Sequence, residues 1–390
     1  MADPEPQRPA PTAKVGGNRL TLLPDGPERL EALIALIEGA RETLRFLYYM
    51  VKDDASGIRV RDALIAAAAR GVKVSLLVDG FGSTANRDFF RPLVDSSVGF
   101  CRFSAHFGRR YLLRNHQKLA LADGRVLITG GFNVSDEYFG TAETGAWRDI
   151  GLRVEGDGVA CLTKYFDDLF RWAGSDNPRI RELRRMLQKH SVTDGPLDWL
   201  FGGPTRRLSP WARAIRRDMQ SARRLDIIAA YFAPSPAILR RIVGVPRQGG
   251  RARLVTAAKS DNNATIGAAR SLYWYLLKRG VEVYEYQPTK LHTKLVVIDD
   301  AVHIGSANFD MRSLFLNLEM MLRVEDAGFA AAMRAFVDGE IAASRRITVE
   351  SHGRERTLLN RLKWALSYFI VAVADYRISR LLNGLGRPSS

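Results

Sequence analysis

The sequence predicts an α/β protein built from two similar halves. Helix-like and strand-like segments alternate along both halves of the chain, and one short polar pattern occurs twice. Such alternation is typical of folds in which helices cover a central sheet. A repeat at domain length indicates duplication of a whole domain and not a solenoid of small units. We therefore expect two duplicated α/β domains with mixed central sheets, packed about a pseudo-two-fold axis.

The first half, residues 19–173, contains a βαβ unit. A helix is expected after Asp25, because Pro27 suits a first turn and apolar residues recur behind it at helical spacing. An Ala-rich helix then separates two apolar runs that read as parallel strands. The expected elements are helix 25–37, strand 44–51, helix 58–70, strand 72–79, strand 150–154 and helix 161–172.

The second half, residues 205–348, repeats this order after a connector. Residues 174–204 are rich in Asp, Arg, Gly and Pro and form the expected connector. The expected elements that follow are helix 210–220, strand 225–231, helix 236–243, strand 253–257, helix 264–280, strand 281–286, strand 319–324 and a helix from 328.

The chain is long, apolar and basic enough to restrict the class of protein. Its 390 residues are 46% hydrophobic, which allows a substantial core. With 58 Lys and Arg against 42 Asp and Glu, the formal net charge is +16. A basic surface favours partners that carry phosphate, either nucleic acid or an anionic membrane surface.

The ends of the chain and its cysteines indicate the compartment. Residues 1–18 are rich in Pro, Ala and Gly, contain no apolar signal-peptide segment and are expected to be a disordered lead-in. Cys101 and Cys161 have neither zinc-cluster nor C-x-x-C spacing and are expected to be core residues. A cytoplasmic protein, peripheral to the cell membrane, is the expectation.

The repeated pattern is a histidine, a lysine two residues later, an aspartate five residues further on, and then an asparagine. The first copy contains His116, Lys118, Asp123 and Asn133, with Gly130-Gly131 before the asparagine. The second contains His292, Lys294, Asp299 and Asn308, with Gly305-Ser306 before the asparagine. If each copy lies on a strand, its histidine and lysine share one face.

The pattern predicts metal-independent phosphoryl chemistry at the interface of the halves. One imidazole can act as nucleophile and a second as general acid, through a phosphohistidine. Two lysines can hold the phosphoryl oxygens, and two asparagines can donate further hydrogen bonds. Lysine does not bind metals at neutral pH, and the pattern has no carboxylate cluster, so no metal or other cofactor is expected.

The doubled pattern resembles the phospholipase D superfamily over residues 44–324, and most of all bacterial cardiolipin synthases and their phosphatidyltransferase relatives. Further matching stretches are Ala69-Arg70-Gly71-Val72, Trp147-Arg148-Asp149, Tyr231-Phe232-Ala233-Pro234, Asn308-Phe309-Asp310-Met311-Arg312-Ser313 and Asn317-Leu318-Glu319.

This resemblance implies roles for the matching residues. His116 is the expected nucleophile and His292 the acid, with the reverse order as the alternative. Lys118, Lys294, Asn133 and Asn308 would hold the phosphate. The carboxylates of Asp149 and Glu319 would orient the histidines. Asp123 and Asp299 belong to the motif but stand at strand ends, and they are expected to be mainly structural.

Three functions follow from these expectations. The first is a cardiolipin synthase-like phosphatidyltransferase acting on phospholipids; transfer to water would make it a phospholipase D. The second is a metal-independent nuclease, disfavoured because the chain holds both motif copies. The third is a non-catalytic basic scaffold. We expect no specific nucleic-acid partner.

Two sequence features depart from the resemblance or lie outside it. Gly131 stands where many family members have serine, which we expect to remove a hydroxyl from the phosphate pocket. Residues 349–390 alternate basic with apolar residues, and their longest uncharged run is too short to cross a bilayer. Either an amphipathic helix at a membrane surface or a helix packed on the fold explains this tail.

Overall fold

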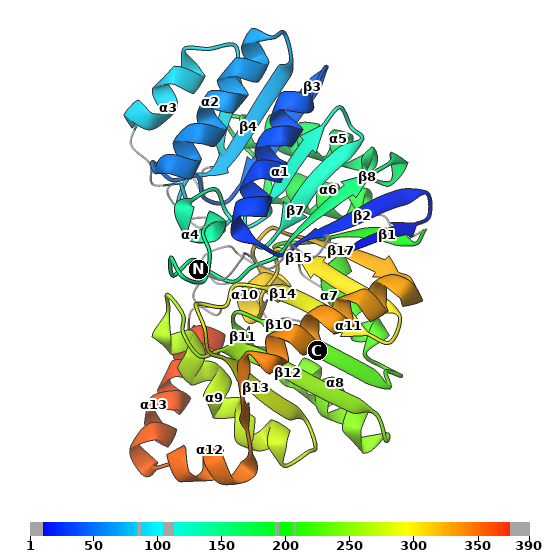
Figure 1. The fold of residues 1–390 in the computed structure, drawn as a ribbon, viewed down its shortest axis with the longest axis vertical. Coiled ribbons are helices and arrows are strands. Elements are labelled where there is room, and N and C mark those ends of the chain that lie inside the picture. Colours follow the sequence, from blue (N-terminus) through cyan, green and yellow to red (C-terminus); the bar gives the residue numbers. More distant parts are fainter. Residues whose placement is uncertain are drawn as a thin grey trace, which may run out of the picture.

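The computed structural model describes residues 11–83, 87–103, 113–191, 193, 195–205 and 208–374. Its two halves are stacked along the longest axis of the molecule, with the first half at the top of Figure 1 and the second below it. Each half is built on a mixed eight-stranded sheet within these described residues. The predicted class, an α/β fold with two mixed sheets, is confirmed.

The first sheet has the order β1-β2-β8-β7-β6-β3-β4-β5. Its strands are β1 (Thr12–Val15), β2 (Asn18–Leu23), β3 (Thr43–Tyr48), β4 (Lys73–Asp79), β5 (Gly99–Phe103), β6 (Leu119–Ala122), β7 (Val126–Gly130) and β8 (Gly151–Glu155). The helices of this half are α1 (Gly26–Gly39), α2 (Ala55–Ala69), α3 (Arg87–Val94), α4 (Asp136–Phe139), α5 (Cys161–Ala173) and α6 (Ile180–His190). The predicted βαβ unit is confirmed, because β3 and β4 pair in parallel on either side of α2.

The second sheet has the order β18-β13-β12-β10-β14-β15-β17-β9. Its strands are β9 (Leu197–Gly202), β10 (Arg224–Ala229), β12 (Arg251–Ala257), β13 (Glu282–Tyr286), β14 (Lys294–Ile298), β15 (Ala301–Gly305), β17 (Glu319–Glu325) and β18 (Ser344–Ile347). A short parallel pair, β11 (Phe232–Ala233) with β16 (Phe309–Asp310), lies beside it. The helices are α7 (Pro210–Asp218), α8 (Pro236–Arg247), α9 (Asn263–Leu277), α10 (Met311–Phe315), α11 (Ala327–Ala342), α12 (Val349–Glu355) and α13 (Leu358–Tyr368), which continues as the π-helical turn η2 (Phe369–Ala374).

The two sheets repeat one topology. The order β2-β8-β7-β6-β3-β4-β5 corresponds strand for strand to β9-β17-β15-β14-β10-β12-β13. The backbone repeats as well: Asp123 and Asp299 have φ of 51° and 45°, and Gly130 and Gly305 have φ of 154° and 158°. Positive φ is rare for a residue with a Cβ, so its recurrence at matching aspartates indicates that both turns are built alike.

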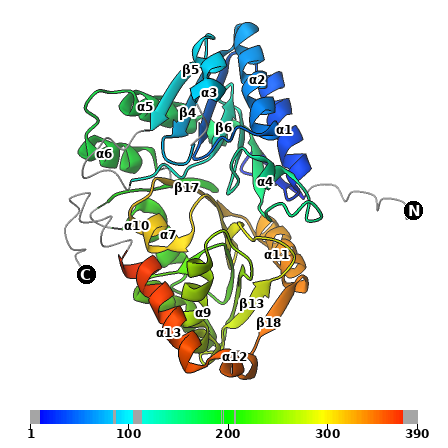
Figure 2. The same ribbon diagram turned by 90° about the vertical axis from the view of Figure 1, so that its left-hand side faces the viewer.

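One apolar core joins the halves. Leu119 and Leu121 of β6 belong to the same buried cluster as Leu295 and Val297 of β14. The intervening residues point the other way, because side chains alternate along a strand. On β6 they meet α1 and α2, and on β14 they meet α7, α8 and α9. The shared core also contains residues of α5, α6 and α11, so helices cover both faces of the sheets (Figures 1 and 2).

The ends of the predicted domains differ from the structure in two places. Residues 12–15 form the edge strand β1 and not a disordered lead-in, because their backbone pairs with β2. The predicted connector contains α6, and it also contains β9, which pairs with β17 in the second sheet. The composition of this segment concealed an edge strand whose partner is far away in the sequence.

Candidate active site

The backbone that carries His116 is held by the opposite half of the molecule. The predicted strand begins only at Leu119, and the residues before it leave the first sheet. Asn115 forms a parallel bridge with Leu318, and the His116 N–H donates to the Leu318 carbonyl at 2.8 Å. The first copy of the motif therefore does not lie wholly on one strand, because the backbone at Asn115 pairs with the second half.

The second copy repeats this crossing in the other direction. Leu291 forms a parallel bridge with Arg148, and the His292 N–H donates to the Arg148 carbonyl at 2.7 Å. The strand proper, β14, begins at Lys294. Each histidine thus follows a segment that is anchored on the partner half.

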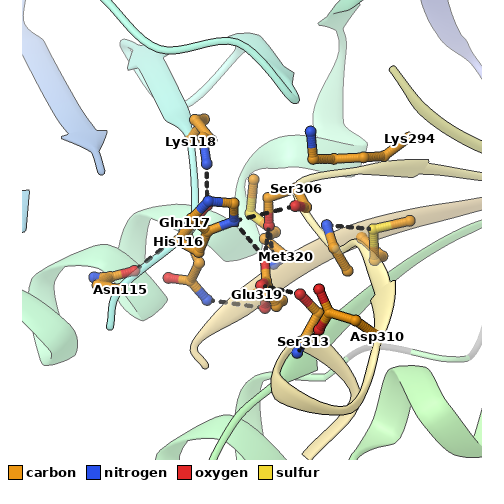
Figure 3. A network of polar contacts seen from close by, with 12 residues as sticks. Asn115, His116, Gln117, Lys118, Lys294, Ser306, Asp310, Ser313, Glu319 and Met320 are labelled. Atoms are coloured by element: carbon orange, nitrogen blue, oxygen red, sulfur yellow. Dashed lines mark hydrogen bonds and ion pairs between the residues drawn. The ribbon is translucent and has the colours of Figure 1, made fainter. Parts of the chain in front are cut away.

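Crossing places each histidine beside a carboxylate of the opposite half. The Nδ1 atom of His116 lies 3.3 Å from a Glu319 oxygen and 3.3 Å from the Ser306 carbonyl (Figure 3). The Nδ1 atom of His292 lies 2.6 Å from the Asp149 carboxylate. The carboxylates and the Ser306 carbonyl are hydrogen-bond acceptors and favour a proton on Nδ1, which leaves Nε2 available. At His292 the closer Asp149 oxygen competes with the Lys294 ammonium, which lies 2.9 Å from the same Nδ1.

The two carboxylates are held differently. Glu319 accepts hydrogen bonds from the hydroxyls of Ser306 at 2.5 Å and Ser313 at 2.9 Å. Asp149 accepts one from the backbone N–H of Ile150 at 2.8 Å. A Cβ added at Gly131, the position that matches Ser306, would lie 2.6 Å from an Asp149 carboxylate oxygen. The interpretation that Gly131 removes a hydroxyl from the phosphate pocket was wrong, since the matching hydroxyl binds a carboxylate.

Both lysines of the motif are buried at the site. Lys118 Nζ donates to the His116 carbonyl at 2.6 Å, and Lys294 Nζ lies 2.9 Å from His292 Nδ1. In Figure 3 the amino groups of Lys118 and Lys294 point toward one region beside the His116 ring. Two cations facing one space can hold the oxygens of a phosphoryl group.

Burial and like charges shift the titration of this group of residues. Burial, with repulsion from Lys294 partly offset by Glu319, lowers the pKa of Lys118 to about 7. Burial also lowers the pKa of Lys294 to about 8, against the attraction of Asp149 and Glu319. For His292, burial and the Lys294 charge lower the pKa to about 4. The positive charges of the lysines and of a protonated histidine therefore repel one another, and an anionic ligand would reduce this repulsion.

The motif asparagines occupy matching buried positions. Asn133 Nδ2 donates to the Tyr138 hydroxyl at 3.0 Å, and the Tyr138 ring lies 5.1 Å from the ring of His292. Within the described residues, the side-chain Oδ1 atoms of Asn133 and Asn308 have no hydrogen-bond partner. Buried polar atoms without partners are uncommon and often mark places where a ligand binds.

Comparison with known proteins gives the family. The family model described as "Cardiolipin synthase, PLD-like domain" matches residues 33–169 and 215–339, which include both copies of the motif. The chain belongs to the cardiolipin synthase, phospholipase D-like family. It is 32% identical over 357 residues to cardiolipin synthase A of Pseudomonas aeruginosa, covering 89% of this chain and 72% of that protein. It is 31% identical over 346 residues to cardiolipin synthase A of Pseudomonas putida, covering 86% and 71%.

Solved structures agree on the fold. Phosphatidylserine synthase of Haemophilus influenzae superposes with a TM-score of 0.71 at 14% identity, covering 94% of this chain and 95% of that one. Polyphosphate kinase of Porphyromonas gingivalis gives 0.53 at 16% identity, covering 83% and 50%. The predicted superfamily and enzyme class, a cardiolipin synthase-like phosphatidyltransferase of phospholipase D type, are confirmed by the family model and the close relatives together.

The motif aspartates of this family member lie at the turns after their strands. The Asp123 carboxylate accepts backbone hydrogen bonds from Arg41, Glu42 and Thr43 at 2.8 to 2.9 Å. Asp299 accepts equivalent bonds from the backbone of residues 223 and 224. Both side chains tie the start of the neighbouring strand, β3 or β10, to the turn, and among the described residues neither is hydrogen-bonded to a motif histidine.

Aromatic residues that the motif did not predict surround the histidines. The ring of Tyr49 lies 4.9 Å from that of His116, and its face is 5.5 Å from Lys118 Nζ. The ring of Trp147 lies 5.4 Å from that of His292. Trp147 stands in a stretch that matches the family, which was a usable signal. Tyr49 follows β3 and had no local signal, because only folding brings it to the motif.

Four histidines and both cysteines lie outside the repeated pattern. His190, His303 and His352 are buried and pack away from the motif histidines: the first two contact Asp168 and Asp218, and the third stacks on Trp364. His106, Arg109 and Arg110 lie outside the described residues. Cys101 and Cys161 are half-buried free thiols.

Proposed function

We propose that the chain transfers a phosphatidyl group from a phospholipid phosphodiester to a second alcohol, with His116 as nucleophile and His292 as general acid and base. The observation that supports this best is the reciprocal pairing of His116 with Glu319 and of His292 with Asp149. Each pair orients an imidazole so that Nε2 is available, and two lysines stand beside them. Two oriented imidazoles are what a two-step displacement at phosphorus requires.

In the first step, His116 Nε2 attacks phosphorus, and the bond from phosphorus to the headgroup oxygen breaks. His292 gives its Nε2 proton to that oxygen, and the headgroup leaves as an alcohol. Lys118, Lys294, Asn133 and Asn308 are the proposed contacts for the non-bridging oxygens, whose charge the two ammonium groups stabilise. In the second step, His292 takes the proton of the acceptor alcohol, whose oxygen attacks phosphorus and breaks the bond to His116.

His292 needs a proton before the first step, and the substrate helps to provide it. In the empty site, burial and the Lys294 charge hold the pKa of His292 at about 4. A bound phosphodiester brings a negative charge beside Lys294, which offsets this repulsion and raises the pKa of the ring. The Asp149 contact at 2.6 Å then stabilises the imidazolium. Protonation of His292 is thereby coupled to substrate binding.

The assignment of nucleophile and acid is tested by trapping. A donor with a good leaving group, such as a p-nitrophenyl phosphodiester, does not need the acid in the first step. His292→Ala should therefore accumulate the phosphohistidine on His116, detectable by mass spectrometry after a denaturing quench, while His116→Ala should not. Label found on His292 in the His116→Ala variant would reverse the assignment.

The reaction is tested with phosphatidylglycerol vesicles and headgroup-resolved analysis of the products. Cardiolipin and glycerol are the products expected of transfer between two phosphatidylglycerols. Phosphatidic acid as the product with no cardiolipin would establish a hydrolase instead. Plasmid and single-stranded DNA incubated with chelator form a further arm, in which cleavage would favour the nuclease. His116→Ala and His292→Ala serve as inactive controls in every arm.

We place this reaction at the surface of an anionic membrane. The formal net charge of +16 favours such a surface. Among the described residues, no helix has the length and apolar character needed to cross a bilayer. We propose peripheral attachment on the cytoplasmic side, supported by the basic charge, and sedimentation of the protein with phosphatidylglycerol vesicles tests the attachment.

A further inference from the structure

Helix α13 carries a row of large apolar side chains on the protein surface. Leu359 is 75% exposed and Phe369, at the start of the turn that follows, is 54% exposed. The other members of this row, hereafter the α13 stripe, are Leu358, Leu362, Leu366 and Ile370, and all are exposed. Contiguous exposed apolar groups mark interaction sites more often than isolated ones do.

The opposite side of α13 is packed on the fold, so the helix already has a buried face and the stripe is a second, exposed face. Trp364 is buried and stacks on His352. Ser367 lies against Gly267 of α9, where an added Cβ would meet its hydroxyl at 2.5 Å. The expected packing of the tail on the fold therefore holds for one face of α13, while residues 375–390 lie outside the described residues.

Basic residues border the stripe. At about 100° per residue, the four leucines of α13 fall within an arc of about 100°. Arg361 lies about 60° beyond one edge of this arc and Lys363 about 40° beyond the other, and both are exposed. An apolar face between basic edges is the composition of a helix that lies in the headgroup region of an anionic bilayer, with its apolar side chains in the acyl boundary.

The stripe leads toward the candidate active site. Arg356, before α13, lies over Trp274 near the end of α9, whereas Ser367 lies beside Gly267 near its start, so the two helices are antiparallel. Ala372, just beyond, packs with Ala233 and with Met311, which follows the motif segment that contains Asn308. Figure 2 shows α13 rising along α9 toward the boundary between the halves.

An exposed aromatic residue lies on the first-half side of the same site. Phe81 is 55% exposed and has the Arg114 guanidinium 3.9 Å from its ring centre. Its loop is tied to the motif, because Asp79 accepts a hydrogen bond from the Asn115 N–H at 2.7 Å. A second apolar group with a basic neighbour thus stands close to His116.

We infer that the α13 stripe inserts into the headgroup region of an anionic phospholipid bilayer and holds the candidate active site against its substrate surface, with Phe81 as a second contact. This inference rests on the proposed function for the identity of the substrate. The bilayer is favoured over a second copy of the chain because the basic edges complement anionic headgroups and would repel the same edges of another copy.

The test compares two pairs of exposed apolar residues. Leu362→Ser with Leu366→Ser alters the stripe, and the control, Ile58→Ser with Val94→Ser, alters exposed residues on α2 and α3 of the first half. Flotation with phosphatidylglycerol and phosphatidylcholine vesicles measures binding. Turnover is measured on those vesicles and on monomeric dihexanoyl phosphatidylglycerol, which presents the same headgroup without a bilayer.

The stripe pair should weaken vesicle binding and vesicle turnover by about tenfold or more, while turnover of the monomeric lipid stays within about twofold. The control pair should leave all three unchanged. If Leu362→Ser with Leu366→Ser floats with vesicles as the wild type does, the inference is overturned. It is also overturned if light scattering shows a wild-type dimer and a monomeric double variant that still floats, because the stripe would then join two copies of the chain. Flotation without turnover of either lipid would instead overturn the proposed function and leave this inference standing.

Discussion

His116 lies 3.3 Å from the carboxylate of Glu319, a residue that belongs to the other half of the molecule. The matching contact joins His292 to Asp149 at 2.6 Å. Neither half therefore contains a complete histidine and carboxylate pair, and the duplicated domains depend on each other for the orientation of their imidazoles. The shared apolar core fixes the position of one sheet relative to the other, so packing away from the site determines these contacts.

Removal of either orienting carboxylate should reduce kcat without unfolding the protein. Glu319→Gln and Asp149→Asn keep shape and remove the charge that stabilises a protonated ring. We expect a fall of about tenfold to 100-fold, the range seen when the partners that orient metal-bound histidines are removed. Turnover of phosphatidylglycerol under saturating conditions, with thermal unfolding measured alongside, is the required experiment.

A double variant distinguishes orientation from a general structural effect. If Glu319 acts through His116, then Glu319→Gln in a His116→Ala background should cost almost nothing further, because residues that act as a unit are not additive. A full additional loss in that background would show that Glu319 acts independently of His116.

Gly131 should not tolerate a side chain. A methyl group there would stand 2.6 Å from an Asp149 oxygen, so that Gly131→Ala displaces the carboxylate that holds His292. We expect kcat to fall by about tenfold to 100-fold. Gly39→Ala is the matched control, because a Cβ at Gly39 would meet nothing within 4 Å. Equal activity of both variants would contradict this account of the glycine.

The sequence predicted the participants of the site better than their connections. The repeated spacing was sufficient to single out His116 and His292, because few other folds require that pattern twice. It could not show that the segments before β6 and β14 cross to the other half, since the bridges there pair Asn115 with Leu318 and Leu291 with Arg148, far apart in sequence.

The same limit explains the errors at the domain ends. Strand β9 pairs with β17, and its pattern lies within a stretch of Asp, Gly and Pro that favours a loop. Tyr49 reaches His116 only after the sheet has formed. The local sequence pattern was therefore sufficient to predict most helices and strands and the residues of the motif. The ends of the domains and the residues that contact the histidines depend on pairing between segments far apart in the sequence.

Binding of a phosphodiester should be accompanied by uptake of protons at pH 8. With pKa values of about 7 and about 8, Lys118 and Lys294 are partly deprotonated there when the site is empty. An anion stabilises their charged forms and raises both pKa values, so protons are taken up and not released. Calorimetric titration with glycerophosphoglycerol in two buffers of different ionisation enthalpy measures the number of protons.

Lys118→Met should reduce that uptake at pH 8 relative to the wild type. Burial places the pKa of His292 at about 4 in the empty site, so any proton that this ring takes up on binding adds to the uptake by the lysines. This contribution is expected in the wild type and in Lys118→Met alike, so the difference between the two proteins reports on Lys118. Heats of binding that are the same in both buffers would reject the coupling.

The motif aspartates should matter for stability and not for the chemical step. Asp123 adopts φ of 51° and its carboxylate binds three backbone N–H groups at the start of β3. Asp123→Ala removes those acceptors and places alanine in an unfavourable backbone region, so the free energy of unfolding should fall by about 2 kcal/mol. Asp123→Asn should recover part of this, because asparagine tolerates positive φ and keeps one acceptor oxygen.

Chemical denaturation and kcat, measured on the same preparations, separate the two roles. The folded fraction of Asp123→Ala should keep kcat within about threefold of the wild type, because neither oxygen of Asp123 is bonded to a histidine or lysine of the site. His116→Ala should show the opposite pattern, with little change in unfolding and turnover reduced to a residual level. An Asp123→Ala protein as stable as the wild type but inactive would assign this aspartate to the catalytic machinery.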